Sequence, residues 1–142
     1  MRELLTRGDC EAVVSLAGRS PGSMRELRTL LLEPEDLIRW RAVQAIGKVM
    51  AVKAERDLEG VRDEVRRLLW SMSDESGNFL PHAPEAIGEI LANVPTLIDE
   101  FAAVLFSFIE EESFERGVHW AIARVSQIAP HASPNLCEGL TG

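Results

Sequence analysis

The sequence predicts an all-α fold in the form of an α-α superhelix, with about three helix pairs behind an N-terminal cap. Two observations predict it. Apolar residues recur with helical spacing along most of the chain, and no stretch alternates apolar and polar residues as a half-buried strand does. In addition, one short helical pattern occurs three times, which is typical of helix pairs that stack on one another.

Periodicity places each expected helix. From Val61, apolar residues follow at i+4, i+7, i+8 and i+11, and the same spacing starts again at Leu97. The stretch after Pro130 is expected to be irregular. In chain order, the expected helices cover 2–6, 10–17, 24–32, 35–52, 58–72, 83–93, 97–110 and 115–129.

Several residues mark where these helices should begin. Asp9 can cap the helix over 10–17, and the run Ser23-Met24-Arg25-Glu26 has the form of a capping box. Thr96 can cap the helix over 97–110. Pro34 and Pro84 suit the first turn of a helix, where the missing N–H does no harm.

The repeated pattern aligns without a gap in three segments, WRAVQAIGKV (40–49), PHAPEAIGEI (81–90) and RGVHWAIARV (116–125). Each follows a separate amphipathic helix, so the unit is a first helix, a turn and a second helix. Small residues should let neighbouring second helices approach closely, and isoleucine should fill the space between them. The matching positions are Ala45/Ala86/Ala121, Ile46/Ile87/Ile122 and Gly47/Gly88/Ala123.

This pattern resembles the HEAT-like repeats, which are also found in phycobilin lyases. Their second helix typically reads Arg-x-x-Ala-x-x-Ala-Leu-Gly, and the best match here is Arg41-Ala42-Val43-Gln44-Ala45-Ile46-Gly47. The resemblance covers roughly residues 24–129 and implies an armadillo-like α-solenoid. It says almost nothing about chemistry, because a fold does not fix a function.

The resemblance implies one HEAT-like domain over 1–142. Its expected parts are an N-terminal cap (1–23), three repeat units (24–52, 58–93 and 97–129) and a C-terminal tail (130–142). Two cysteines, Cys10 and Cys137, match no metal-binding spacing and favour a reducing, cytoplasmic location. Because a stack separates its ends, we expect no disulfide between them within one chain.

Composition narrows the choice of partner. The net charge of −8 argues against nucleic acid, which needs a basic face, and no apolar run is long enough to span a membrane. The helix over 97–110 is apolar nearly all round, so it is expected to be sandwiched in the fold, covered by the tail, or used in a homodimer.

Catalytic motifs are absent from the sequence, so we expect no catalytic residues and no cofactor. His82 and Glu85 are three residues apart, and with His119 of the next unit they are candidates for a metal site. Deoxyhypusine hydroxylase, a HEAT-like enzyme, holds iron with His-Glu pairs, but this chain has no His-Glu dipeptide. The alternative is that His82 packs beside the start of its helix.

In stacked helical repeats the second helices usually line the concave face. The residues expected to form a binding surface there are Arg41, Gln44, Lys48, His82, Glu85, Glu89, Trp120 and Arg124. Alternatively, their charges pair between repeats and hold the stack together. Trp40, Trp70 and Trp120 have two interpretations as well, as parts of the core or as contact anchors.

The sequence therefore favours a non-enzymatic HEAT-like scaffold that binds a protein partner of unknown identity through this face. A second hypothesis is a lyase-like or metal-dependent factor that acts on a cofactor or a modified protein in the groove. The two differ in one observable feature: the second needs a pocket in which His82, Glu85 and His119 converge.

Overall fold

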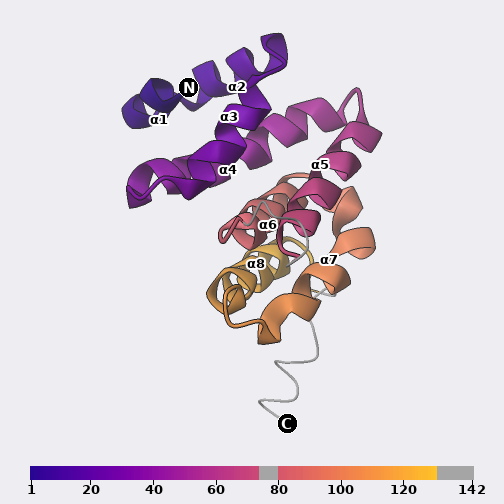
Figure 1. Ribbon diagram of the computed structural model, residues 1–142. Coiled ribbons are helices and arrows are strands. Elements are labelled where there is room, and N and C mark those ends of the chain that lie inside the picture. Colours follow the sequence, from indigo (N-terminus) through magenta and orange to yellow (C-terminus); the bar gives the residue numbers. More distant parts are fainter. Residues whose placement is uncertain (74–79, 131–142) are drawn as a thin grey trace.

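The computed structural model describes residues 1–73 and 80–130 (Figure 1). The described residues contain no β-strand, so the predicted all-α class is confirmed. Their α-helices are α1 (Arg2–Arg7), α2 (Cys10–Arg19), α3 (Ser23–Thr29), α4 (Asp36–Ala54), α5 (Leu58–Ser71), α6 (Ala83–Asn93), α7 (Ile98–Phe106) and α8 (Glu115–Ile128). Short 3-10 segments lie between them: η1 (Leu30–Leu32) after α3, η2 (Pro95–Leu97) after α6 and η3 (Ser107–Glu110) after α7.

The expected helix positions are close to the observed ones, but two predicted caps are wrong. Asp9 does cap α2, because its carboxylate accepts a hydrogen bond from the Ala12 N–H at 3.1 Å. Ser23 instead lies inside α3, and its hydroxyl donates to the Leu16 carbonyl at 3.5 Å. Thr96 lies within η2, so α7 begins without a side-chain cap.

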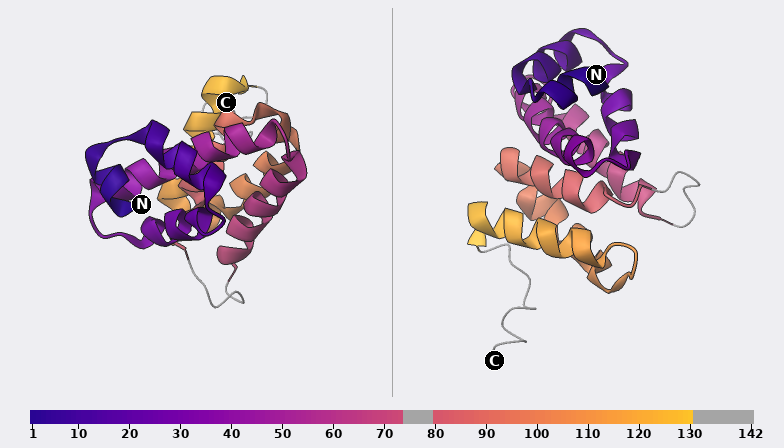
Figure 2. Two further views of the ribbon diagram at one scale, coloured as in Figure 1. Left: turned by 90° about the horizontal axis from the view of Figure 1, so that it is seen from above. Right: turned by 90° about the vertical axis from the view of Figure 1, so that its left-hand side faces the viewer.

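Three helices lie side by side through the molecule, with α6 between α4 and α8 (Figures 1 and 2). We call α4, α6 and α8 the central row. On one side of it, α5 packs against α4 and α6, and α7 packs against α6 and α8. At the N-terminal end, α1, α2, α3 and η1 all contact α4. The second helices of the three sequence repeats are the members of the central row.

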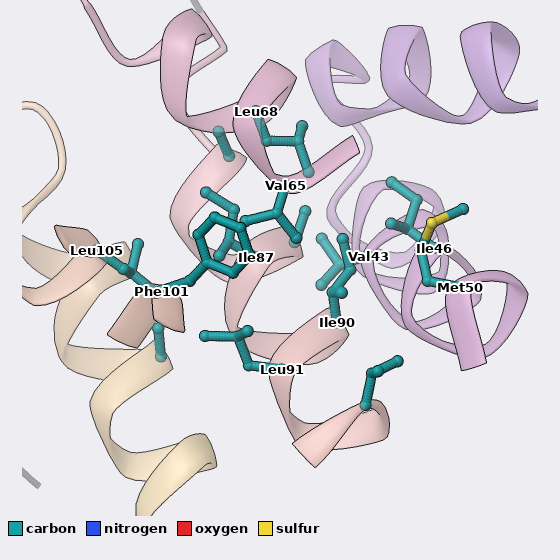
Figure 3. Packing of buried hydrophobic residues seen from close by; sticks show 14 of the residues in the cluster. Val43, Ile46, Met50, Val65, Leu68, Ile87, Ile90, Leu91, Phe101 and Leu105 are labelled. Atoms are coloured by element: carbon teal, nitrogen blue, oxygen red, sulfur yellow. The ribbon is translucent and has the colours of Figure 1, made fainter. Parts of the chain in front are cut away.

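The three aligned segments contribute buried residues to the core, at the positions that match between them (Figure 3). Ile46 of α4 and Ile87 of α6 are 0% exposed, and Val65 of α5 lies between Ile87 and Val43 of α4. Other small and apolar residues at matching positions of the three aligned segments are also buried: Ala42, Ala45, Val49, Ala83, Ala86, Ile90, Val118, Ala121, Ile122 and Val125.

Two glycines at equivalent repeat positions let the helices of the central row approach closely. A Cβ on Gly47 would lie 2.5 Å from Glu89 Cγ on α6, and a Cβ on Gly88 would lie 2.7 Å from Ala121 Cβ on α8. Both distances are far below ordinary carbon–carbon contact, about 3.5–4.0 Å. The expectation that these positions need small residues is confirmed.

The apolar segment over 97–110 is mainly covered by the chain itself. Phe101, Leu105 and Phe106 are buried, and Val104 is the large apolar residue of α7 that remains exposed, at 49%. No single helix in the described part of the chain is long and apolar enough to cross a membrane; residues 83–93 and 95–110 pass that test only as a pair bent by 113°. Cys10 is a free thiol, and Cys137 lies outside the described residues.

Candidate binding face on the central row

Two tryptophans from different repeats meet on the central row. The rings of Trp40 (α4) and Trp120 (α8) are 4.8 Å apart between centroids and 85° apart in plane, an edge-to-face pair. Trp40 is 36% exposed, and Trp120 is partly buried against the position of Gly88, whose Cβ would lie 3.5 Å from the indole. The pair therefore joins the outer helices of the row and still presents aromatic surface to solvent.

The three predicted residues of α4 differ in their roles. Arg41 donates from Nη1 to the carbonyls of Leu5 (2.8 Å) and Thr6 (2.9 Å), so it holds the last turn of α1 against α4. Gln44 and Lys48 are exposed, and neither has a hydrogen-bond or ion-pair partner among the described residues. With Trp40 they form one stripe along α4, because residues at i, i+4 and i+8 share a helix face.

The histidine and first acid of α6 form a local pair. His82 Nδ1 lies 2.8 Å from Glu85 Oε2, and Glu85 is 14% exposed. The other oxygen, Oε1, is buried without a hydrogen bond from the described residues, and a Cβ on Gly117 would lie 2.2 Å from it. Gly117 on α8 therefore leaves the space that the Glu85 carboxylate fills. The sequence predicts an ordered turn over residues 73–82 at the mouth of the groove, but residues 74–79 lie outside the described residues.

Glu89, which the sequence placed on the expected binding surface, is instead buried. Its side chain is 8% exposed and pairs with Arg124 of α8, with Arg124 Nε 3.1 Å from Glu89 Oε2. Asn93 Nδ2 also donates to the Glu89 carbonyl at 2.8 Å. The pair links neighbouring members of the central row, which is the stack-holding alternative raised above. An isolated sequence cannot distinguish the two roles, since both use the same helix face.

The three metal candidates do not form a metal site. His119 is exposed, while His82 already pairs with Glu85 at the start of α6. Within residues 1–73 and 80–130, no group of three or more His, Cys, Asp or Glu side chains is arranged to hold a metal ion.

The sequence showed no sign of a cavity of about 450 Å³ whose charged lining residues come from α3, the end of α4, the turn between α4 and α5, and α5. These residues are Arg28, Lys53, Arg56, Asp57, Glu64 and Arg67. They span 40 positions of the chain, so no local motif could have grouped them. The periodicity did place Arg28 and Glu64 on predicted helices, but pairing them required the tertiary structure.

Elsewhere on α5 the charges are already paired with one another. Hydrogen bonds from Arg66 and Arg62 hold the pKa of the Glu59 carboxyl below its usual value. Arg62 also donates from Nε to Glu100 of α7 at 2.9 Å. This network joins two layers at the surface and has the character of a structural ion-pair cluster.

No family model matches this chain, and no solved structure matches it. A curated relative, an uncharacterized protein of Archaeoglobus fulgidus, is 35% identical over 116 residues. The match covers 81% of this chain and 60% of that relative, so the chain spans less than two thirds of the relative's length.

Proposed function

We propose that this chain is a short α-α superhelix of HEAT-like repeats that binds a protein partner on the central row. The support for the superhelix is the equivalence of its units. Gly47 and Gly88 occupy the same repeat position, and each faces the next helix of the row at a distance too short for a side chain. A unit whose helices cannot bury both faces alone gains stability from such stacking.

The observation that supports a partner on this face is the Trp40–Trp120 pair. Tryptophan is the residue type most enriched among the energetic anchors of protein interfaces, and these two rings stay partly exposed. Gln44 and Lys48 continue the stripe without partners among the described residues. The chemistry of this surface fits a partner segment with an apolar or aromatic side chain for the indoles and a carboxylate for Lys48.

Glu89 and Arg124 have a supporting part in this proposal. Their ion pair ties α6 to α8, so they keep Trp120 in place rather than meeting the partner. Arg41 has the same kind of part, because its guanidinium is used by the α1 carbonyls. The contact residues reduce to Trp40, Gln44, Lys48 and Trp120.

A photo-crosslinking residue at position 44 tests the proposal. Crosslinking in cells of the source organism is expected to yield one dominant protein, identified by mass spectrometry, and Trp40→Ala should reduce that product at least several-fold. Trp70→Ala is the matched control, because Trp70 is also exposed, at 56%, but belongs to α5, which is not a member of the central row. The control should leave the yield unchanged.

Two results would contradict the proposal. Equal loss in Trp40→Ala and Trp70→Ala would mean that the crosslink does not depend on this face. A product formed by two copies of the chain would replace the separate partner with a homodimer.

A further inference from the structure

The cavity at the junction of α4 and α5 carries an excess of positive charge. Four cationic side chains line it, Arg28, Lys53, Arg56 and Arg67, against two carboxylates, Asp57 and Glu64. The whole chain has the opposite balance, with 15 Lys and Arg against 23 Asp and Glu. A local cation excess of two in an acidic protein marks this cavity as a place that attracts anions.

Most of these cations lack a counter-charge within residues 1–73 and 80–130. Lys53, Arg56 and Arg67 have no ion-pair partner among the described residues. Arg66, the immediate neighbour of Arg67, pairs with Glu59 at 3.2 Å and with Asp63 at 3.0 Å. On this helix Arg62 and Arg66 are therefore paired, whereas Arg67, which is exposed and lines the cavity, is not.

Glu64 supplies a second, independent feature of the cavity. Its side chain is 9% exposed, and Oε1 accepts a hydrogen bond from Arg28 Nη1 at 2.7 Å. The second oxygen, Oε2, is buried and accepts no hydrogen bond from the described residues. A buried acceptor of this kind is costly unless a donor reaches it. Oε2 is closed to solvent, but Glu64 lines the cavity, so a rotation of its carboxylate brings this oxygen within reach of a hydroxyl group on a bound molecule.

We propose that this cavity binds a small phosphate monoester that also carries hydroxyl groups, of the sugar-phosphate class. Lys53, Arg56 and Arg67 hold the phosphate, and Glu64 Oε2 accepts from a hydroxyl. The charge fits, because a phosphate monoester near neutral pH carries about −1.5 to −2, which the cation excess balances. A carboxylate would leave part of that excess unpaired.

The size of the cavity fits as well. Its volume of about 450 Å³ lies within the usual range for small-molecule sites, about 300–1,000 Å³. Arg28 and Arg67 also border a neighbouring cavity of about 480 Å³ that includes Trp70 and Leu80. The two cavities therefore share these two arginines in their linings.

Calorimetric titration with three probes tests the proposal. Ribose 5-phosphate has both groups, methyl phosphate has the phosphate alone, and ribose has the hydroxyls alone. Ribose 5-phosphate is expected to bind at least about tenfold more tightly than methyl phosphate, because a hydrogen bond to a carboxylate is among the stronger kinds. Ribose alone should give no measurable heat.

Two arginine variants distinguish binding in the cavity from a general electrostatic attraction of the ligand to the protein. Arg67→Ala should weaken ribose 5-phosphate at least about tenfold by removing a charged phosphate donor. Arg116→Ala is the matched control, since Arg116 is an exposed arginine of α8 outside the cavity. It should leave the affinity within about twofold, because distant exposed charges are screened by salt.

The same experiment can overturn the proposal. Failure of ribose 5-phosphate to bind at millimolar concentration rules it out, and so does equal weakening by both arginine variants. Equal affinity for ribose 5-phosphate and methyl phosphate removes the role of Glu64 and with it the proposed ligand class. Trp40→Ala should leave the binding of ribose 5-phosphate unchanged. The proposal for the cavity and the proposal for the partner-binding face can therefore be refuted separately.

Discussion

Gly88→Ala is expected to destabilise the protein, although alanine is normally the better helix residue. At an open position in a helix, alanine in place of glycine stabilises by about 0.5–1 kcal/mol. At Gly88, however, the new Cβ would lie 2.7 Å from Ala121 Cβ and 3.0 Å from Ala121 Cα. The second of these atoms is backbone, so relief requires α6 and α8 to separate by roughly 1 Å, given carbon contact distances of about 3.5–4.0 Å.

The expected magnitude follows from these opposing effects. Overpacking a filled interface costs about 1–3 kcal/mol. The intrinsic preference for alanine offsets part of this, about 0.5–1 kcal/mol, which leaves a net loss of up to about 2.5 kcal/mol. Gly18→Ala in α2 is the control, because a Cβ there would meet no atom within 4 Å. It should gain up to about 1 kcal/mol.

Urea unfolding of the two variants, measured side by side with the unaltered protein, tests these opposite changes in stability. The midpoint should fall for Gly88→Ala and rise for Gly18→Ala, with similar slopes, since neither change alters the surface exposed on unfolding. If Gly88→Ala is as stabilising as Gly18→Ala, then α6 and α8 are not in the close contact described here, and the stacking argument fails.

Two further outcomes are expected in the same assay. Ile46→Ala and Ile87→Ala should each cost about 2–5 kcal/mol, since both side chains are fully buried at equivalent repeat positions; losses under about 1 kcal/mol would invalidate the repeat alignment. Glu89→Ala should cost about 2–4 kcal/mol, slightly below the usual loss for a broken buried pair because Arg124 is 30% exposed and can turn toward water. In a double-mutant cycle, Arg124→Ala should cost far less in the Glu89→Ala background, and additive losses would show that the pair is not coupled.

The repeat made much of the fold predictable. Helical spacing placed the helices to within a few residues, and the positions of Ile46 and Ile87 identified the core without any structure. Ser23 was misplaced because a serine followed by a glutamate three residues later suits both a cap and an early helical turn. In the structure α3 starts at Ser23, and the Ser23 hydroxyl donates to the Leu16 carbonyl of α2 instead of capping α3.

The candidate site was only partly predictable. The helix face bearing Trp120 and Lys48 could be selected from the repeat register, because equivalent residues of stacked helices face the same way. Whether each side chain on that face is buried or exposed could not be predicted. Glu89 and Lys48 occupy equivalent positions, yet Glu89 is buried against Arg124 while Lys48 remains exposed.

The sequence by itself determined the helices, their order and which residues of each repeat face inward, because these depend on spacing within about 20 residues along the chain. Only the tertiary structure decided which polar residues make contacts within the fold and which remain free to bind other molecules. Arg41 reaches α1, and Glu64 meets Arg28 from another helix. Such pairings depend on distances between helices far apart in sequence, and no local pattern encodes those distances.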